Sequence, residues 1–401
     1  MAPPGGDETR DDDPGVTESR GIYRSASRIT LCVYDVCYVR LVQREPSESE
    51  HDVTGKPVSV DKGIPRPSGR FVRAVNAEAE TEVDDGLDEH FGDVAGAILD
   101  GDVVPVLGAG VNLCDRADDE QWERGRSLPS GRELADMLAK RFAWDATDRD
   151  LVHVSQAAVL RRGADPLFKL LHNVFVGDYE PTSVHRFLAG LPALRERRGL
   201  DPCPQLIVTT NYDGLLERAF TEAGEPFDVL YYLGEGGDRK RAHGKFMHVD
   251  AKGRHRTVNV PNKYVDATID KRSVILKIHG AAREDPAEDS WVITEDHYID
   301  YLTRTTLSEL IPVKLLEKLL NCNFLFMGYG MKDWNVRVML HRIFTQRRHG
   351  HDGWASWAVQ LDSDPIDRAL WKKNNVSIQA MNLKDYLARL QSSLETAEPW
   401  C

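Results

Sequence analysis

Several features that mark other protein classes are missing from this sequence. It has no apolar run of 18 residues, which argues against a membrane-spanning helix. Residues 1–20 are acidic and rich in Pro and Gly, without the apolar segment of a secretory signal. The six cysteines form no Cys-x-x-Cys pair, so neither a zinc ribbon nor a disulfide framework is indicated. These absences predict a cytoplasmic protein with reduced thiols, no bound metal and no membrane contact.

The acidic balance of charge argues against a general nucleic-acid-binding surface. The formal net charge is −13, and 41% of the 401 residues are hydrophobic, which is enough for a sizeable core. This length fits two average domains or one large α/β domain with insertions. A single basic run within 239–256 is typical of a solvated polar loop. We therefore expect no sequence-specific binding of nucleic acid.

Apolar strand-like runs alternate with amphipathic segments over most of the chain. This alternation predicts a Rossmann-like parallel sheet with helices on both faces. The predicted strands are 103–107, 205–210, 273–278, 323–327, 356–361 and 376–380. The predicted helices are 87–99, 130–142, 150–161, 165–176, 183–190, 214–223, 296–303, 308–320, 333–345, 365–373 and 383–395.

Composition divides the chain into two parts. Residues 1–85 are rich in Asp, Glu, Ser, Pro and Gly, and we expect a poorly ordered arm with one short β element near 29–42. Residues 86–401 form the predicted α/β domain. Within it, 224–270 is polar and Gly-rich, and we expect it to be a helical or loop insertion.

The most informative stretch is the strand 103–107, which ends in Gly108-Ala109-Gly110 and is followed by Asn112. The missing side chains would let backbone N–H groups approach an anionic ligand. A helix beginning there would add the positive end of its dipole. Simple packing of a helix against the sheet is the alternative explanation of these glycines.

Three more strands end in polar or glycine-rich motifs: Thr210-Asn211-Tyr212-Asp213, His279-Gly280 and Gly328-Tyr329-Gly330. Each has a structural alternative, because Asn and Asp cap helices, a buried His can be purely structural, and Gly-Tyr-Gly can form a turn. Ligands of parallel sheets bind beyond the carboxyl ends of the strands. Four such ends on one sheet therefore predict a shared ligand site.

Together with Asp333, and with Lys277-Ile278 directly before His279-Gly280, these four motifs resemble the ordered motif set of the sirtuin-like NAD-binding fold. The likeness covers about 86–395 and is greatest to the branch found in bacterial anti-phage defence systems. Three further stretches support it: Leu128-Pro129-Ser130 with Glu133-Leu134, Pro181-Thr182-x-x-His185, and Trp291-Val292-Ile293-Thr294-Glu295-Asp296-x-Tyr298.

The sequence departs from the protein deacylases of that family in three ways. The segment after Gly110 lacks their Ile-Pro-Asp-Phe-Arg loop, and Thr210 stands where they carry Gln. The four-cysteine zinc module is absent, and the 224–270 insertion takes its place. The resemblance thus implies an NAD pocket and argues against a peptide-docking groove.

The resemblance implies that NAD is the substrate and that its nicotinamide–ribose bond is cleaved by water. His279 would act as general base, Asn211 would hold the water and the ribose, and Asp213 would orient this network. The residues expected to bind the dinucleotide are Gly108, Ala109, Gly110, Asn112, Thr210, Tyr212, Gly328, Tyr329, Gly330 and Asp333. Among these, Gly108 to Asn112 would cradle the pyrophosphate, and Gly328, Gly330 and Asp333 would contact the adenosine half.

The leading hypothesis is an NAD glycohydrolase that acts as an abortive-infection effector against phage. Such an enzyme must be restrained, so we expect a homo-oligomer or a separate sensor subunit, such as a HerA-type ATPase or a short Argonaute. An NAD-dependent deacylase or ADP-ribosyltransferase is one alternative. A non-enzymatic module that binds NAD or ADP-ribose within a larger assembly is the other.

Overall fold

The computed structural model describes residues 71–117, 119–144, 150–237, 242–267, 269–303, 310–330, 343, 355–361 and 365–398, with the side chains of 71–85 excepted. Pro67–Cys401 form one compact unit. The strand predicted near 29–42, most of the helix predicted at 333–345, and Asp333 lie outside the described residues.

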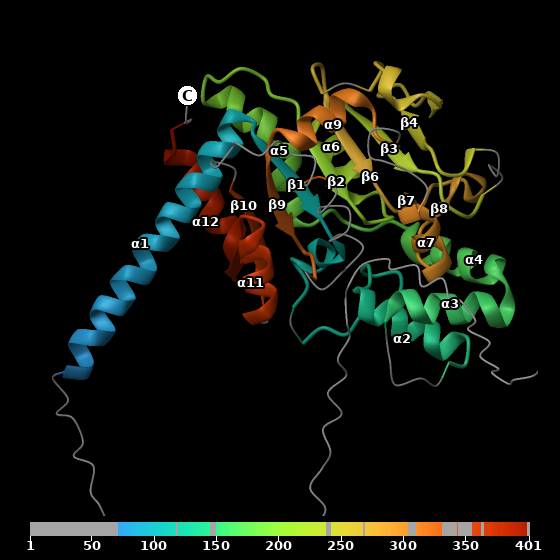
Figure 1. The fold of residues 1–401 in the computed structure, drawn as a ribbon, viewed down its shortest axis with the longest axis horizontal. Coiled ribbons are helices and arrows are strands. Elements are labelled where there is room, and N and C mark those ends of the chain that lie inside the picture. The colour runs from blue at the N-terminus through green and yellow to red at the C-terminus, as the bar shows by residue number, and fades with distance from the viewer. Residues whose placement is uncertain are drawn as a thin grey trace, which may run out of the picture. The chain divides into compact units, whose positions relative to one another are not determined.

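Within the described residues, strands and helices alternate as predicted (Figure 1). The strands are β1 (Val103–Leu107), β2 (Leu206–Thr209), β3 (Phe227–Tyr232), β4 (Phe246–Val249), β5 (His255–Val258), β6 (Ser273–Lys277), β7 (Gly280–Ala281), β8 (Ser290–Trp291), β9 (Asn323–Met327), β10 (Ser356–Gln360) and β11 (Val376–Ala380). The α-helices are α1 (Phe71–Asp100), α2 (Gly131–Arg141), α3 (Leu151–Arg162), α4 (Ala164–Phe175), α5 (Ser183–Arg197), α6 (Leu215–Ala223), α7 (Glu295–Thr303), α9 (Val313–Leu320), α11 (Pro365–Lys373) and α12 (Leu383–Thr396).

Nine strands form the main sheet in the order β11-β10-β9-β1-β2-β6-β3-β4-β5, and all neighbours except β3–β4 and β4–β5 pair in parallel. This confirms the predicted Rossmann-like α/β class. The four strands with unusual ends, β9, β1, β2 and β6, are consecutive in the sheet. Parallel pairing puts their carboxyl ends at one edge, where ligands of such sheets bind.

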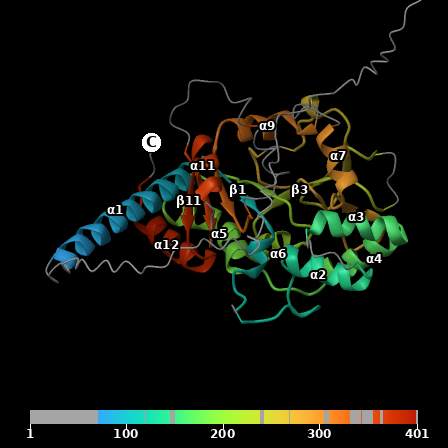
Figure 2. The same cartoon turned by 60° about the horizontal axis from the view of Figure 1, so that its bottom comes forward.

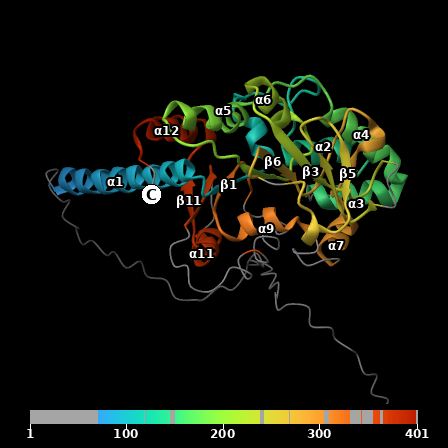
Figure 3. The ribbon, with the colours of Figure 1, turned by 90° about the horizontal axis from the view of Figure 1, so that it is seen from above.

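Helices cover both faces of the sheet, which explains why its central strands are mostly apolar and buried at every position (Figure 3). On one face, α1, α5, α6 and α12 pack around side chains such as Phe220 and Tyr386. On the other face, α7, α9 and α11 contribute Tyr298, Leu315 and Trp371 to a second core.

A third apolar cluster holds α2, α3 and α4 together beside the strand ends (Figure 2). The chain enters this group through Ser130, whose hydroxyl accepts from Glu133 N–H while the Glu133 carboxylate accepts from Ser130 N–H. This capping box explains why α2 begins where the sequence predicted. Tyr212 and Trp291 belong to the same cluster and join it to the sheet.

The segment 224–270 differs from the predicted helical or loop insertion, because it supplies three strands of the main sheet. Inside it, β3 pairs in parallel with β6, and β4 and β5 extend the sheet as an antiparallel hairpin. Asp228 of β3 is fully buried and accepts from Arg272 Nε at 2.6 Å and Ala251 N–H at 2.9 Å. Asp228 is thus one polar residue of this segment that lies inside the sheet in a buried pair.

Two other features differ from expectation. The helix predicted from residue 87 begins earlier, at Phe71. The glycine turn after β1 leads into a 3₁₀ helix, η1 (Ala109–Leu113), instead of an α-helix. In the part of the chain that the structure describes, no helix combines the length and apolar character needed to span a bilayer.

Candidate active site

The four strand ends meet around one cavity of about 870 Å³. Every predicted site residue within the described chain lines it: Gly108, Ala109, Gly110, Asn112, Thr210, Asn211, Tyr212, Asp213, His279, Gly328, Tyr329 and Gly330. Residues of α2, α3 and α7 complete the wall. A cavity of this size accommodates a small-molecule ligand.

Glycine is required at the strand ends because two loops touch backbone to backbone. A Cβ on Gly108 would lie 2.6 Å from Gly328 O, and one on Gly110 would lie 2.8 Å from the Cα of Gly328. Gly328 has a φ of +68°, and its Cβ would lie 2.3 Å from Val111 N. Gly330, in contrast, has open space where a Cβ would be. The loops after β1 and β9 therefore lock together through three glycines.

The same contact uses the backbone donors of the glycine loop. Gly108 N–H donates to Met327 O at 3.0 Å, and Gly110 N–H donates to Gly328 O at 2.9 Å. The sequence suggested that the N–H groups of Gly108 and Gly110 approach an anionic ligand. Both N–H groups instead donate to carbonyl oxygens of the protein, so that explanation of the two glycines is wrong. A five-residue 3₁₀ helix also supplies little of the expected helix dipole. The glycines shape the cavity by joining its two loops.

Asn211 follows β2 and is fixed by two bonds. Its N–H donates to Thr209 Oγ1 at 3.0 Å, and its Nδ2 donates to Gly108 O at 3.2 Å. The bonds thus hold a buried carboxamide in the cavity wall beside the glycine loop.

Asp213 is a buried carboxylate with both oxygens occupied. Oδ1 accepts from Leu215 N–H at 3.1 Å, the N–H of the first residue of α6, and Oδ2 accepts from Asn112 Nδ2 at 2.9 Å. Its backbone carbonyl accepts from Lys277 Nζ. Asp213 therefore binds the backbone at the start of α6 and also orients a cavity residue.

His279 comes directly after Ile278 at the end of β6 and is fully buried. Its Nδ1 lies 3.4 Å from Tyr298 Oη, and the rings meet edge to face with centroids 5.2 Å apart. Burial lowers the pKa of His279 to about 3, because a buried imidazole loses the hydration that favours its charged form. The imidazole is therefore neutral at pH 7 and suited to accept a hydrogen bond.

The predicted tyrosines act mainly as structural ties. Tyr212 Oη donates to Val292 O at 2.7 Å, and its ring packs against Phe175 and Trp291. Tyr329 Oη donates to Thr210 Oγ1 at 2.9 Å, which links the loops after β9 and β2. These bonds keep the cavity walls in place.

Sequence reasoning gave no role to two residues that support the site. Tyr298 reaches His279 from α7, and Lys277 is completely buried two positions before it. Lys277 Nζ donates to Glu217 Oε1 at 2.7 Å as well as to Asp213 O. The signal for Lys277 was present in the sequence, because it is the one charged residue in β6 and directly follows three aliphatic residues.

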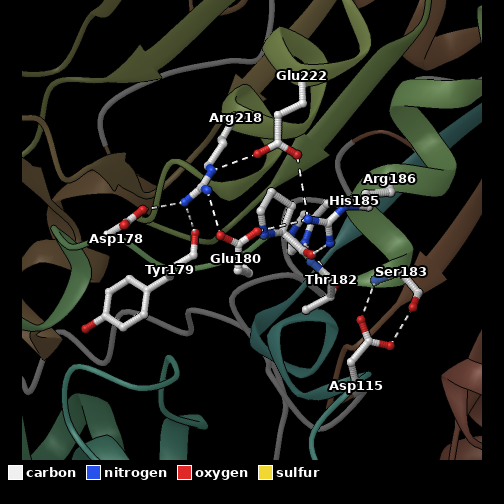
Figure 4. A network of polar contacts seen from close by, with 11 residues as sticks. Asp115, Asp178, Tyr179, Glu180, Thr182, Ser183, His185, Arg186, Arg218 and Glu222 are labelled. Atoms are coloured by element: carbon white, nitrogen blue, oxygen red, sulfur yellow. Dashed lines mark hydrogen bonds and ion pairs between the residues drawn. The ribbon is translucent and has the colours of Figure 1, made fainter.

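The start of α5 is hydrogen-bonded to η1 and to the loop that follows it, next to the cavity. Thr182 Oγ1 donates to Val111 O at 2.9 Å, and Thr182 N–H donates to His185 Nδ1 at 3.1 Å. Asp115 accepts from Ser183 N–H at 2.6 Å (Figure 4). These bonds explain the spacing of the Pro181-Thr182-x-x-His185 motif, because they tie α5 to η1.

A network of ion pairs fixes the loop that leads to α5. Arg218 of α6 lies 2.7 Å from both Asp178 and Glu180 and 2.8 Å from Glu222 (Figure 4). Arg186 of α5 pairs with Glu180 at 3.0 Å. The partners are well exposed, so the network positions the loop more than it stabilises the fold.

The charged side chains that line the cavity are all acidic within the described residues. They are Asp150, Asp213 and Glu295, and His279 is neutral. Asp150 caps α3 by accepting from His153 N–H at 3.0 Å, and Glu295 lies 2.8 Å from His153 Nδ1. Across the described chain, no group of three or more His, Cys, Asp or Glu is placed to hold a metal ion. Binding in this cavity thus relies on hydrogen bonds and shape.

A comparison with protein families finds one similarity. Residues 205–379 match the family model described as the SIR2-like domain. The matched segment includes the ends of β2, β6 and β9, while β1 and its glycine loop precede it. No curated protein matches the chain. The parallel sheet and the strand-end motifs agree with this match, so residues 205–379 resemble a SIR2-like domain.

Proposed function

We propose that this protein is an NAD glycohydrolase. It would cleave the bond between nicotinamide and ribose, with water adding to the ribose carbon, nicotinamide leaving with the bonding electrons, and one proton released. The observation that carries the proposal is the meeting of Asn211, His279 and the two glycine loops around one cavity at the carboxyl edge of the sheet.

The chemistry of these groups suits that reaction. Cleavage of a glycosidic bond builds positive charge on the ribose, which needs a polar cavity and a well-placed nucleophile. A neutral imidazole at position 279 would accept a hydrogen bond from the water or from a ribose hydroxyl. The fixed carboxamide of Asn211 would hold the same groups, and the acidic side chains of the cavity would favour the developing positive charge.

The biological role that we propose is depletion of NAD during phage infection. It rests on the resemblance of the motifs to the defence branch of the family. An enzyme of this kind must be silent in healthy cells, so control by self-assembly or by a sensor subunit, such as a HerA-type ATPase, belongs to the proposal.

The test is incubation of the purified full chain with NAD, alone and with the product of the neighbouring gene, followed by chromatography of the products. Equal amounts of nicotinamide and ADP-ribose without any acceptor would support the proposal. Nicotinamide release only with an acyl-lysine peptide or a protein acceptor would indicate a deacylase or ADP-ribosyltransferase. Saturable binding without turnover would indicate a non-enzymatic module.

A further inference from the structure

Asn112 is a buried cavity residue whose side-chain NH₂ group is hydrogen-bonded and whose side-chain oxygen is not. It lies on η1, lines the cavity and is 8% exposed. Its Nδ2 donates to Asp213 Oδ2 at 2.9 Å, while its Oδ1 is buried without a hydrogen-bond partner. Among the described residues of the cavity wall, no other buried side-chain polar atom is left in this state. Such an atom calls for an explanation, because leaving it unpaired costs free energy.

The neighbouring groups determine which way this amide faces. An ionised carboxylate only accepts hydrogen bonds, so the NH₂ end of Asn112 must face Asp213. Asp213 cannot turn away, because its other oxygen accepts from Leu215 N–H at the start of α6 and its carbonyl is held by the Lys277 ammonium. The chain Lys277–Asp213–Asn112 therefore presents a carbonyl oxygen at residue 112.

A carbonyl oxygen selects its ligand by polarity. It accepts from N–H or O–H groups, whereas phosphate oxygens are acceptors that would meet a second acceptor close to the negative charge of Asp213. We infer that Asn112 binds a hydrogen-bond donor of the dinucleotide, an amide N–H or a ribose O–H, instead of the pyrophosphate for which the sequence suggested it. This inference rests on the proposed function.

The test measures binding and does not depend on turnover. Nicotinamide carries amide donors without hydroxyls, and ADP-ribose carries hydroxyls without the carboxamide. The affinities of the full-length wild-type chain, Asn112→Ala and Asp213→Asn for both ligands are measured by calorimetry. Asp213→Asn keeps the shape of the side chain but can also donate, so it frees the residue 112 amide to turn around.

We expect both variants to lose about tenfold in affinity for the same ligand. Loss for nicotinamide assigns the amide donor, and loss for ADP-ribose assigns a ribose hydroxyl. Asn382→Ala is the matched control. It removes the side-chain oxygen that accepts from Asp385 N–H at the start of α12, and Asn382 does not line the cavity. This variant should leave both affinities unchanged. If Asn112→Ala does not fold, Asp213→Asn carries the test.

Three results would overturn the inference, and they are distinguishable. If the wild-type chain binds a ligand and both variants bind it equally well, Asn112 contacts no ligand donor and the proposed function still stands. If the wild-type chain binds neither nicotinamide nor ADP-ribose but consumes NAD, the inference is overturned and the proposed function stands. If it binds neither ligand and also consumes no NAD, alone or with the product of the neighbouring gene, both fail.

Discussion

Replacing Lys277 with Met should strongly destabilise the protein, and replacing Glu217 with Leu at the same time should restore most of the loss. The Lys277 side chain is 2% exposed and that of Glu217 is 14% exposed, with 2.7 Å between Nζ and Oε1. Removing the ammonium leaves a buried carboxylate unpaired, which costs about 3–5 kcal/mol. The carbonyl of Asp213 also loses its donor, for about 1 kcal/mol more.

The double variant Lys277→Met, Glu217→Leu removes both buried charges. Apolar replacement of a buried ion pair is often nearly neutral. We therefore expect the free energy of unfolding of the double variant to lie within about 1–2 kcal/mol of the wild-type value, and the difference to come from the unpaired carbonyl of Asp213. The assay is equilibrium denaturation in urea, followed by tryptophan fluorescence and circular dichroism. Lys314→Met is the control, because its pair with Glu317 is exposed and should contribute less than about 0.5 kcal/mol. A single variant as stable as the wild type, or a double variant no better than the single, would refute the reasoning.

Two further predictions follow from burial and from backbone contact. Burial lowers the pKa of His90 to about 4 from its ordinary 6.5, so the stabilisation from neutral His90 is complete above pH 6.5 and is lost as the pH falls toward 4. The free energy of unfolding, measured by urea denaturation, should therefore fall by about 2 kcal/mol less between pH 7 and pH 5 in His90→Gln than in the wild type. An equal fall in both proteins would contradict this. Gly328→Ala should destabilise the folded protein by about 3 kcal/mol or more, because residue 328 has a positive φ and the added Cβ would collide with Val111 N. Gly330→Ala should leave the thermal unfolding nearly unchanged, because there is open space where its Cβ would be. Equal effects of the two variants would show that the loops after β1 and β9 do not interlock as described.

The sequence allowed the central architecture to be predicted because the strongest signals are local. Apolar runs such as 103–107 and 323–327 end abruptly at glycine, and the Ser130–Glu133 capping box marks the start of α2. Parallel pairing then requires the strand ends to share an edge, which is why the predicted site residues could be grouped before any coordinates were known.

Features that depend on distant contacts were not predictable in the same way. β5 is polar because it is an edge strand, so composition alone made it look like part of a loop, although its partner β4 (Phe246–Val249) is buried and mostly apolar. β3 is a missed local signal, since Phe227–Tyr232 is almost entirely apolar. The low pKa of His279 depends on its burial in the folded protein, which the sequence does not show. The reason for Gly108 depends on contact with Gly328, which lies far along the chain.

The central claim is that Asn211 and His279 act on NAD in one cavity. The most direct measurement compares NAD consumption by the wild type, Asn211→Ala and His279→Ala, under whichever condition activates the wild type, with circular dichroism to verify folding. The account predicts that both variants fold and consume no NAD, and that the wild type releases nicotinamide and ADP-ribose in equal amounts. Wild-type rates in both folded variants would contradict it.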